Sequence, residues 1–336
     1  MTLPDAVAAA MFAGVVVYAV LGGADFGSGF WDLTAGDARR GAEVRTLVDH
    51  SIGPVWEANH VWLIYVLVFW WTAFPRAFAA VMTTLYLPLA LVLLGIVLRG
   101  ASFAFRKYAE DLRQAQIFGV VFATSSVITP FFLGVTAGAI ASGRVPAAGH
   151  GDALDSWLHP APLIAGALAV GTCSFLAGVF LTADAARDGH RDLSERLRRG
   201  SMAVAAASGV VAIAAIVPVR RDAETLGDDL LGRAAPLVVL SVIFGIVTLV
   251  LLVRRTYGPA RLTAVGAVVA VVAGWGVAQY PWMLVDTLTI EAAAGARSTQ
   301  AALLVVVGLA VVLVLPPLAY LLVLTQRSLP QEGTVG

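Results

Sequence analysis

The chain has 336 residues, of which 59% are hydrophobic and only 13% are charged, and its formal net charge is zero. An average soluble domain carries about 25% charged residues, so this composition excludes an ordinary soluble protein and indicates a membrane protein with several spanning segments. A net charge of zero gives no electrostatic basis for binding nucleic acid. The single cysteine, Cys173, excludes an intrachain disulfide and lies in an apolar run, where we expect a buried structural thiol.

A helix needs about 20 mostly apolar residues to cross a membrane, and the chain offers about nine such segments. We therefore predict an all-α integral membrane protein in which residues 1–336 form one polytopic domain. The fourth segment contains Thr129-Pro130, where we expect a kink. The segments lie near residues 7–30, 54–74, 77–98, 116–141, 160–183, 201–219, 232–253, 261–282 and 300–325.

A weak internal echo suggests two related halves. The first segment ends with an Ala-Asp pair at Asp25 and the fifth with another at Asp184, and a basic loop follows each. Parallel repeats occur among membrane transport proteins. We therefore predict two four-helix units, over residues 1–141 and 160–282, followed by an extra helix at 300–325.

The basic residues indicate the orientation. The loops after the first, third, fifth and seventh segments are rich in arginine, including Arg45 and Arg106, whereas the alternate loops hold fewer basic residues. Because positive charge marks the cytoplasmic side, we predict that the N-terminus lies outside and the C-terminus in the cytoplasm. Arg220 and Arg221, after the sixth segment, are a partial exception.

Ionisable residues within the apolar segments are the candidates for function. With the predicted orientation, Asp25 and Glu57 lie at a similar depth on the cytoplasmic side, and Arg99, at the inner end of the third segment, is placed to join them. Such residues usually face the bundle interior and mark proton relays or other functional sites. Glycines beside Asp25 would allow close helix approach. From the residues alone, a proton entry path and a buried structural ion cluster are about equally supported.

Two motifs carry a resemblance to a known family. They are G-P-V-W-E-A-N-H-V-W-L-I at residues 53–64 and G-A-D-F-G at residues 23–27, followed by Arg99 after the next apolar run. At this spacing the chain resembles subunit II of cytochrome bd-type quinol oxidases. The resemblance implies a subunit of a quinol:oxygen oxidoreductase of an aerobic respiratory chain, in the bacterial cell membrane.

The resemblance also implies a cytoplasmic proton path that serves the reduction of oxygen to water. This chain departs from the family pattern at Ala104, where some relatives have a further acid. The implied path residues are Asp25, Glu57 and Arg99, with Asn59 and His60 as helpers.

The resemblance places the cofactors in a partner. Haem b and haem d, or a second haem b, would lie in subunit I, which oxidises membrane quinol; a structural quinone and a small accessory subunit are further components that the family admits. A haem with two axial histidines needs ligands at matched depth on facing helices, and only His60 of the five histidines lies well inside a segment. We therefore expect no cofactor, metal or catalytic residue in this chain. His60 as a ligand is the less favoured alternative to a hydrogen bond with Glu57.

Two other functions stay open. A proton-coupled secondary transporter would suit the paired acids and the internal echo, although the polar residues gather at one membrane face. A purely structural partner within the bilayer, with no path through it, is the second alternative.

Overall fold

The computed structural model describes residues 2–36, 41–52, 56–106, 108, 111–313, 316–317 and 320, without the side chains of residues 52, 56–58 and 112. The described chain is almost entirely helical, as the apolar segments predict. The longer helices are α1 (Leu3–Thr34), α3 (Trp56–Ala73), α5 (Tyr86–Arg106), α6 (Leu112–Ala141), α7 (Pro160–Arg187), α8 (Arg191–Asp222), α10 (Ala235–Val253), α11 (Tyr257–Gln279) and α13 (Arg297–Leu313). The shorter elements are α2 (Ala42–Ile52), α4 (Pro75–Thr84), α9 (Glu224–Leu231), α12 (Ile290–Ala293), β1 (Trp282–Leu284) and β2 (Leu288–Thr289).

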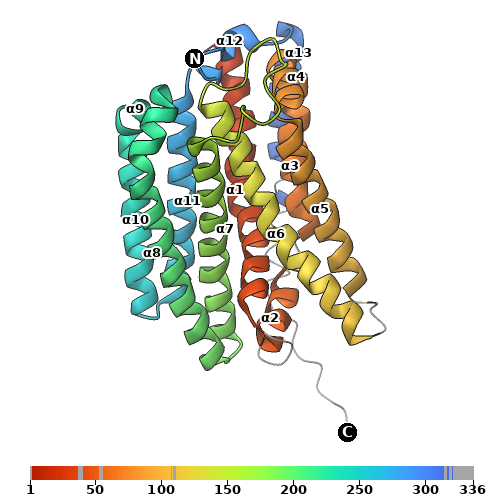
Figure 1. The fold of residues 1–336 in the computed structure, drawn as a ribbon, viewed down its shortest axis with the longest axis vertical. Coiled ribbons are helices and arrows are strands. Elements are labelled where there is room, and N and C mark those ends of the chain that lie inside the picture. Colours follow the sequence, from red (N-terminus) through yellow and green to blue (C-terminus); the bar gives the residue numbers. More distant parts are fainter. Residues whose placement is uncertain are drawn as a thin grey trace.

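The long helices form an upright bundle with α1 at its centre (Figure 1). α1 packs against α3, α6, α7 and α11, so other helices cover most of its length. α2 lies at one end of the bundle, whereas α9 and α12 lie at the other. We call the first of these the α2 end; it is the predicted cytoplasmic side.

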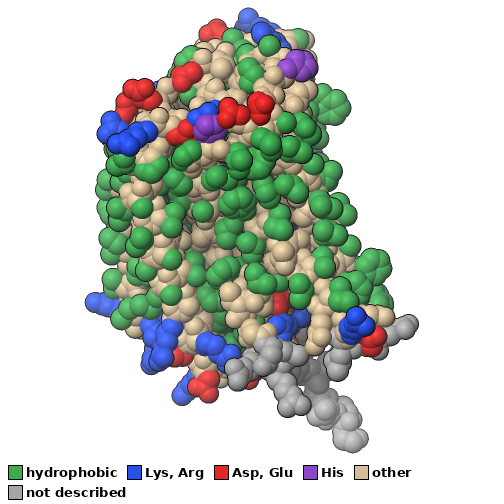
Figure 2. Space-filling view, in the orientation of Figure 1, with side chains coloured by type: hydrophobic (Ala, Val, Ile, Leu, Met, Phe, Trp, Pro, Cys, Tyr) green, Lys and Arg blue, Asp and Glu red, His purple; other side chains and the backbone are tan. Residues whose placement is uncertain are grey.

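Hydrophobic side chains form a broad band around the bundle, and charged side chains gather at its two ends (Figure 2). Among the described residues, seven helices are long and apolar enough to cross a membrane, or eight if Asn59–Ala73 and Pro75–Thr84 form one broken span. α13 is apolar as well, with 17 described residues. The prediction of a multi-pass membrane protein is confirmed, while the count of nine spans and the orientation stay predictions.

The segment predicted as one span at 77–98 is two helices, so that prediction was wrong. α4 ends at Thr84 and α5 begins at Tyr86. Pro88 explains the break, because it has no N–H to donate to the carbonyl of Thr84. Before it, Pro75 begins α4 after a bend of 117° from α3.

Several helices run beyond the apolar residues that predicted them. The sequence had suggested that Arg99 lies at the end of a helix. α5 continues to Arg106, so Arg99 lies inside it. α8 begins at Arg191, well before the predicted span. Helix propagation needs backbone hydrogen bonds and not an apolar side chain at every position, so hydropathy underestimates helix length. α6 runs through Pro130 as one helix, and the expected kink there stays a prediction.

Candidate functional site

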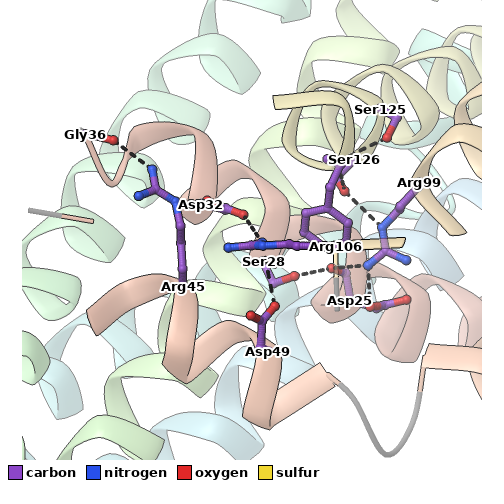
Figure 3. Close-up of polar contacts among 11 residues, drawn as sticks. Asp25, Ser28, Asp32, Gly36, Arg45, Asp49, Arg99, Arg106, Ser125 and Ser126 are labelled. Atoms are coloured by element: carbon purple, nitrogen blue, oxygen red, sulfur yellow. Dashed lines mark hydrogen bonds and ion pairs between the residues drawn. The ribbon is translucent and has the colours of Figure 1, made fainter. Parts of the chain in front are cut away.

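A buried ion pair joins α1 to α5. Nη2 of Arg99 donates to Oδ1 of Asp25 at 2.6 Å, and both side chains are 2% exposed. The same nitrogen donates to the backbone carbonyl of Asp25 at 3.2 Å, and Nε donates to the hydroxyl of Ser126 on α6 at 2.9 Å (Figure 3). The structure therefore brings together two of the three charged residues predicted for the site and ties them to a third helix.

Two aromatic rings flank the guanidinium of Arg99. Its Cζ lies 5.1 Å from the ring centre of Phe26 and 4.9 Å from that of Phe122. A cation over an aromatic face gains about 2 kcal/mol when water is excluded. The rings and the hydrogen bonds together compensate this arginine for the water that it loses on burial.

The two oxygens of the Asp25 carboxylate have different surroundings. Oδ1 is bound by Arg99, whereas Oδ2 is buried and has no hydrogen-bond partner among the described residues. Oδ2 is therefore a buried carboxylate oxygen with room for a further hydrogen bond.

Small residues around Asp25 let α1 approach its neighbours, as predicted. A Cβ at Gly27 would overlap the backbone carbonyl of Cys173 on α7, and one at Gly29 would overlap the side chain of Ser126 on α6. Cys173, expected to be a buried thiol, is a free and partly buried cysteine at this contact. The close approach of three helices keeps the ion pair dry.

α3 brings further polar residues to α1. Asn59 is buried and His60 is partly buried, and the His60 ring packs edge-on against Phe26 with the ring centroids 6.0 Å apart. The ring of Phe26 is also one of the two that flank the guanidinium of Arg99. The side chain of Glu57 lies outside the described residues, so its meeting with Asp25 and its hydrogen bond to His60 stay predictions.

A second ion cluster, which the sequence analysis missed, lies between the first pair and the α2 end. Asp32 is 3% exposed; its Oδ1 accepts from Nε of Arg45 at 2.8 Å, and its Oδ2 accepts from Nη1 of Arg106 at 3.2 Å. The same nitrogen of Arg106 lies 3.7 Å from Oδ1 of Asp49. The missed signal was spacing, because Asp32 follows Asp25 by about two helical turns on one face of α1.

The described residues offer little to a metal or a haem. No group of three or more His, Cys, Asp and Glu side chains among them is placed to hold a metal ion. His60 lies in a long apolar helix, whereas the other histidines lie in α2, in the 142–159 loop or at helix starts. In the described part of the chain, this donor set does not fit a haem with histidine ligands on two facing helices.

Comparison with known proteins gives this site a context. The family described as cytochrome bd terminal oxidase subunit II matches residues 3–325. The chain belongs to the cytochrome bd oxidase subunit II family. Its fold is also that of a chain in a solved structure described as bd oxidase from Geobacillus thermodenitrificans, with a TM-score of 0.81 and 24% sequence identity over 97% of this chain and 99% of that chain.

Two curated relatives show how far the sequence likeness extends. Cytochrome bd ubiquinol oxidase subunit 2 of Bacillus subtilis (strain 168) is 36% identical over 115 residues, which are 34% of this chain and 33% of the relative. Cytochrome bd-I ubiquinol oxidase subunit 2 of Escherichia coli (strain K12) is 30% identical over 129 residues, 38% of this chain and 33% of the relative. The chain thus matches about a third of each relative's length. As a member of the bd oxidase subunit II family with several apolar helices, it is a multi-pass protein of the bacterial cytoplasmic membrane.

Proposed function

We propose that this chain is subunit II of a quinol:oxygen oxidoreductase of an aerobic respiratory chain. In that complex it supplies part of the path by which cytoplasmic protons reach the site of oxygen reduction. The observation that carries the proposal is the Asp25–Arg99 pair, a dry carboxylate with one oxygen paired and the other open, in a member of this family. Intramembrane acids of this kind serve proton relays. The names of the relatives support a quinol as electron donor.

The haems of the complex belong, in this proposal, to a partner subunit I that pairs with this chain in the membrane. The family implies haem b with haem d or a second haem b, and the described histidines of this chain do not supply a facing pair of axial ligands. Haem in the partner supplies the electron transfer that reduces oxygen to water. A structural quinone and a small accessory subunit remain predictions from the family.

The residues of this chain hold and move protons. Arg99 holds the carboxylate of Asp25 in place between proton arrivals through its ion pair. A proton binds at the open Oδ2, and its release to the next group restores the ion pair. In this proposal Glu57 is the acid that receives the proton next, and Asn59 and His60 are helpers in this transfer.

Replacing the ion pair as a unit tests the proposal. Asp25→Asn with Arg99→Gln removes both charges, so neither is left buried alone, which is the outcome that destabilises most. We expect the complex to assemble with its haem absorption intact and its oxygen-uptake rate per haem to fall about a hundredfold or more, the size of effect that a positioned proton carrier has.

The matched control is Asp184→Asn with Arg261→Gln, which removes an ion pair of the same kind between α7 and α11. We expect this control to keep nearly full turnover. Full turnover in the Asp25 double variant would remove Asp25 from the path and leave a purely structural partner as the better description.

A further inference from the structure

Polar side chains continue from the Asp25–Arg99 pair to the α2 end. Asp25, Ser28 and Asp32 recur at i, i+3 and i+7, so they share one face of α1, and Ser28 and Asp32 are both buried. On α5, Arg106 follows Arg99 at the same spacing. Figure 3 shows Ser28 between the first pair and the cluster around Asp32.

The cluster around Asp32 differs from the inner pair in how its carboxylate is used. Both oxygens of Asp32 are occupied, one by Arg45 and the other by Arg106. Arg106 also lies within reach of Asp49, whose side chain is 42% exposed. One guanidinium nitrogen of Arg106 thus lies 3.2 Å from the buried carboxylate of Asp32 and 3.7 Å from that of the partly exposed Asp49.

We propose that Asp32 is the carboxylate at which cytoplasmic protons enter the path, and that Arg106 admits them by changing partner from Asp32 to Asp49. This inference deepens the proposed function and rests on it. While Arg106 binds Asp32, both carboxylate oxygens are paired and the entrance is closed. When Arg106 moves to Asp49, Oδ2 of Asp32 is open to water.

The step involves one proton and no other bond change. A hydronium ion of the cytoplasmic water gives its proton to Oδ2 of Asp32, and one O–H bond forms. That bond breaks when the proton passes inward through water and the Ser28 hydroxyl to Oδ2 of Asp25, about 10 Å along α1. The return of Arg106 restores the starting ion pair. Arg45 and Arg106 stay protonated throughout, because a guanidinium does not release its proton in proteins.

The charges around Asp32 make Arg106 the moving part. Among the described residues, Arg45 faces Asp32 from α2 and Arg106 faces it from α5, with Asp49 of α2 behind Arg106. Arg45 is also held by the carbonyl of Gly36 at 2.7 Å, which fixes its position. Arg106 has instead a second carboxylate to move to, so the exchange keeps its charge paired at every stage.

The experiment measures oxygen uptake per haem by the assembled complex across a range of pH. For Asp32→Asn we expect turnover to fall about a hundredfold, since a positioned proton carrier is lost, and to fall most at high pH, where protons are scarce. Asp49→Asn removes the alternative partner of Arg106, so we expect a smaller deficit of the same pH dependence. Asp32→Glu keeps the acid and is expected to restore most of the rate.

The matched control is Glu195→Gln on α8. This carboxylate is also bound by arginines, Arg198 at 2.6 Å, Arg199 at 2.9 Å and Arg255 at 3.4 Å, away from the proposed path. We expect its turnover and pH profile to equal those of the unmodified complex.

Two results would overturn the inference. If the cluster only holds α1, α2 and α5 together, the Asp32→Asn complex would lose thermal stability but keep its turnover and pH profile. An unaffected Asp49→Asn would exclude the exchange of partners. If Asp32→Asn fails to assemble, Asp32→Glu and Asp49→Asn carry the test. The Asp25–Arg99 double variant separates failure of this inference from failure of the proposed function. If the double variant is slow while Asp32→Asn is not, the proton path stands without this entrance. If both variants keep full turnover, the proposed function fails.

Discussion

Two carboxylate–arginine pairs in this protein share their chemistry but not their surroundings. Asp25 pairs with Arg99 between α1 and α5, and Asp184 pairs with Arg261 between α7 and α11. In each pair the guanidinium carbon lies 5.1 Å from the ring centre of a phenylalanine on the carboxylate's own helix. In each, the arginine also donates to a backbone carbonyl of that helix, at 3.2 and 3.0 Å.

The difference lies in burial and in the number of partners. The Asp25 pair is 2% exposed on both sides, whereas the side chains of Asp184 and Arg261 are 13% and 25% exposed. Asp184 is shared with Arg187, and its second oxygen accepts from Ser51 at 3.4 Å. Asp184 thus has several partners and solvent nearby, whereas Asp25 is dry and keeps one oxygen open. The same kind of ion pair thus joins α7 to α11 near solvent and, in our proposal, carries protons where it joins α1 to α5.

Removing each arginine separately should give the largest contrast. Arg99→Gln leaves the charge of Asp25 buried without its partner, which costs about 3–5 kcal/mol. Arg261→Gln leaves Asp184 with Arg187 and with solvent, so the expected loss is about 1 kcal/mol or less. Thermal denaturation of the two purified complexes measures both losses of stability. Equal losses would show that the two ion pairs contribute equally to stability.

Glu57→Gln examines the relay beyond Asp25. The amide keeps the shape of the side chain but cannot carry a proton, so we expect assembly to stay intact and oxygen uptake per haem to fall about a hundredfold. Glu195→Gln is the control for loss of a carboxylate at the α2 end. Full activity in Glu57→Gln would take this residue out of the path.

The smallest expected effect comes from the serines beside the two pairs. Ser126 accepts a buried hydrogen bond from Arg99 at 2.9 Å, so Ser126→Ala should cost about 1–3 kcal/mol. Ser51 makes a long and partly solvated contact to Asp184, so Ser51→Ala should stay within about 0.5 kcal/mol. The same denaturation measurement ranks them, and a reversed order would contradict the difference in burial between the pairs.

Parts of the site could be predicted from the sequence because charge inside an apolar run needs a partner. Asp25 and Arg99 stood out in this way, and the structure pairs them. Asp32 and Arg106 did not, because they lie where the apolar runs end. Asp32 was not singled out, and Arg106 was interpreted only as a basic loop residue that indicates orientation. Their meeting depends on α1 and α5 continuing past the apolar band, which hydropathy does not record.

The fold shows the same limit. The apolar segments predicted the long helices, because a spanning helix must satisfy its backbone internally and cover itself with apolar side chains. The break before Tyr86 was missed, although Pro88 was visible, because the apolar run continues across it. α2 was missed because its short amphipathic helix forms within a basic connection. The two-unit repeat stays a prediction, and the likeness of the Asp25 and Asp184 pairs agrees with it.

The most direct measurement of the central claim is an infrared difference spectrum of the complex between its oxidised and reduced states. The account predicts a carbonyl band of a protonated carboxyl group that shifts in heavy water. The band should be absent from the Asp25→Asn, Arg99→Gln complex and present in the Asp184→Asn, Arg261→Gln complex. A band that persists unchanged without Asp25, or that disappears without Asp184, would contradict the claim that the dry pair carries protons and the wetter pair does not.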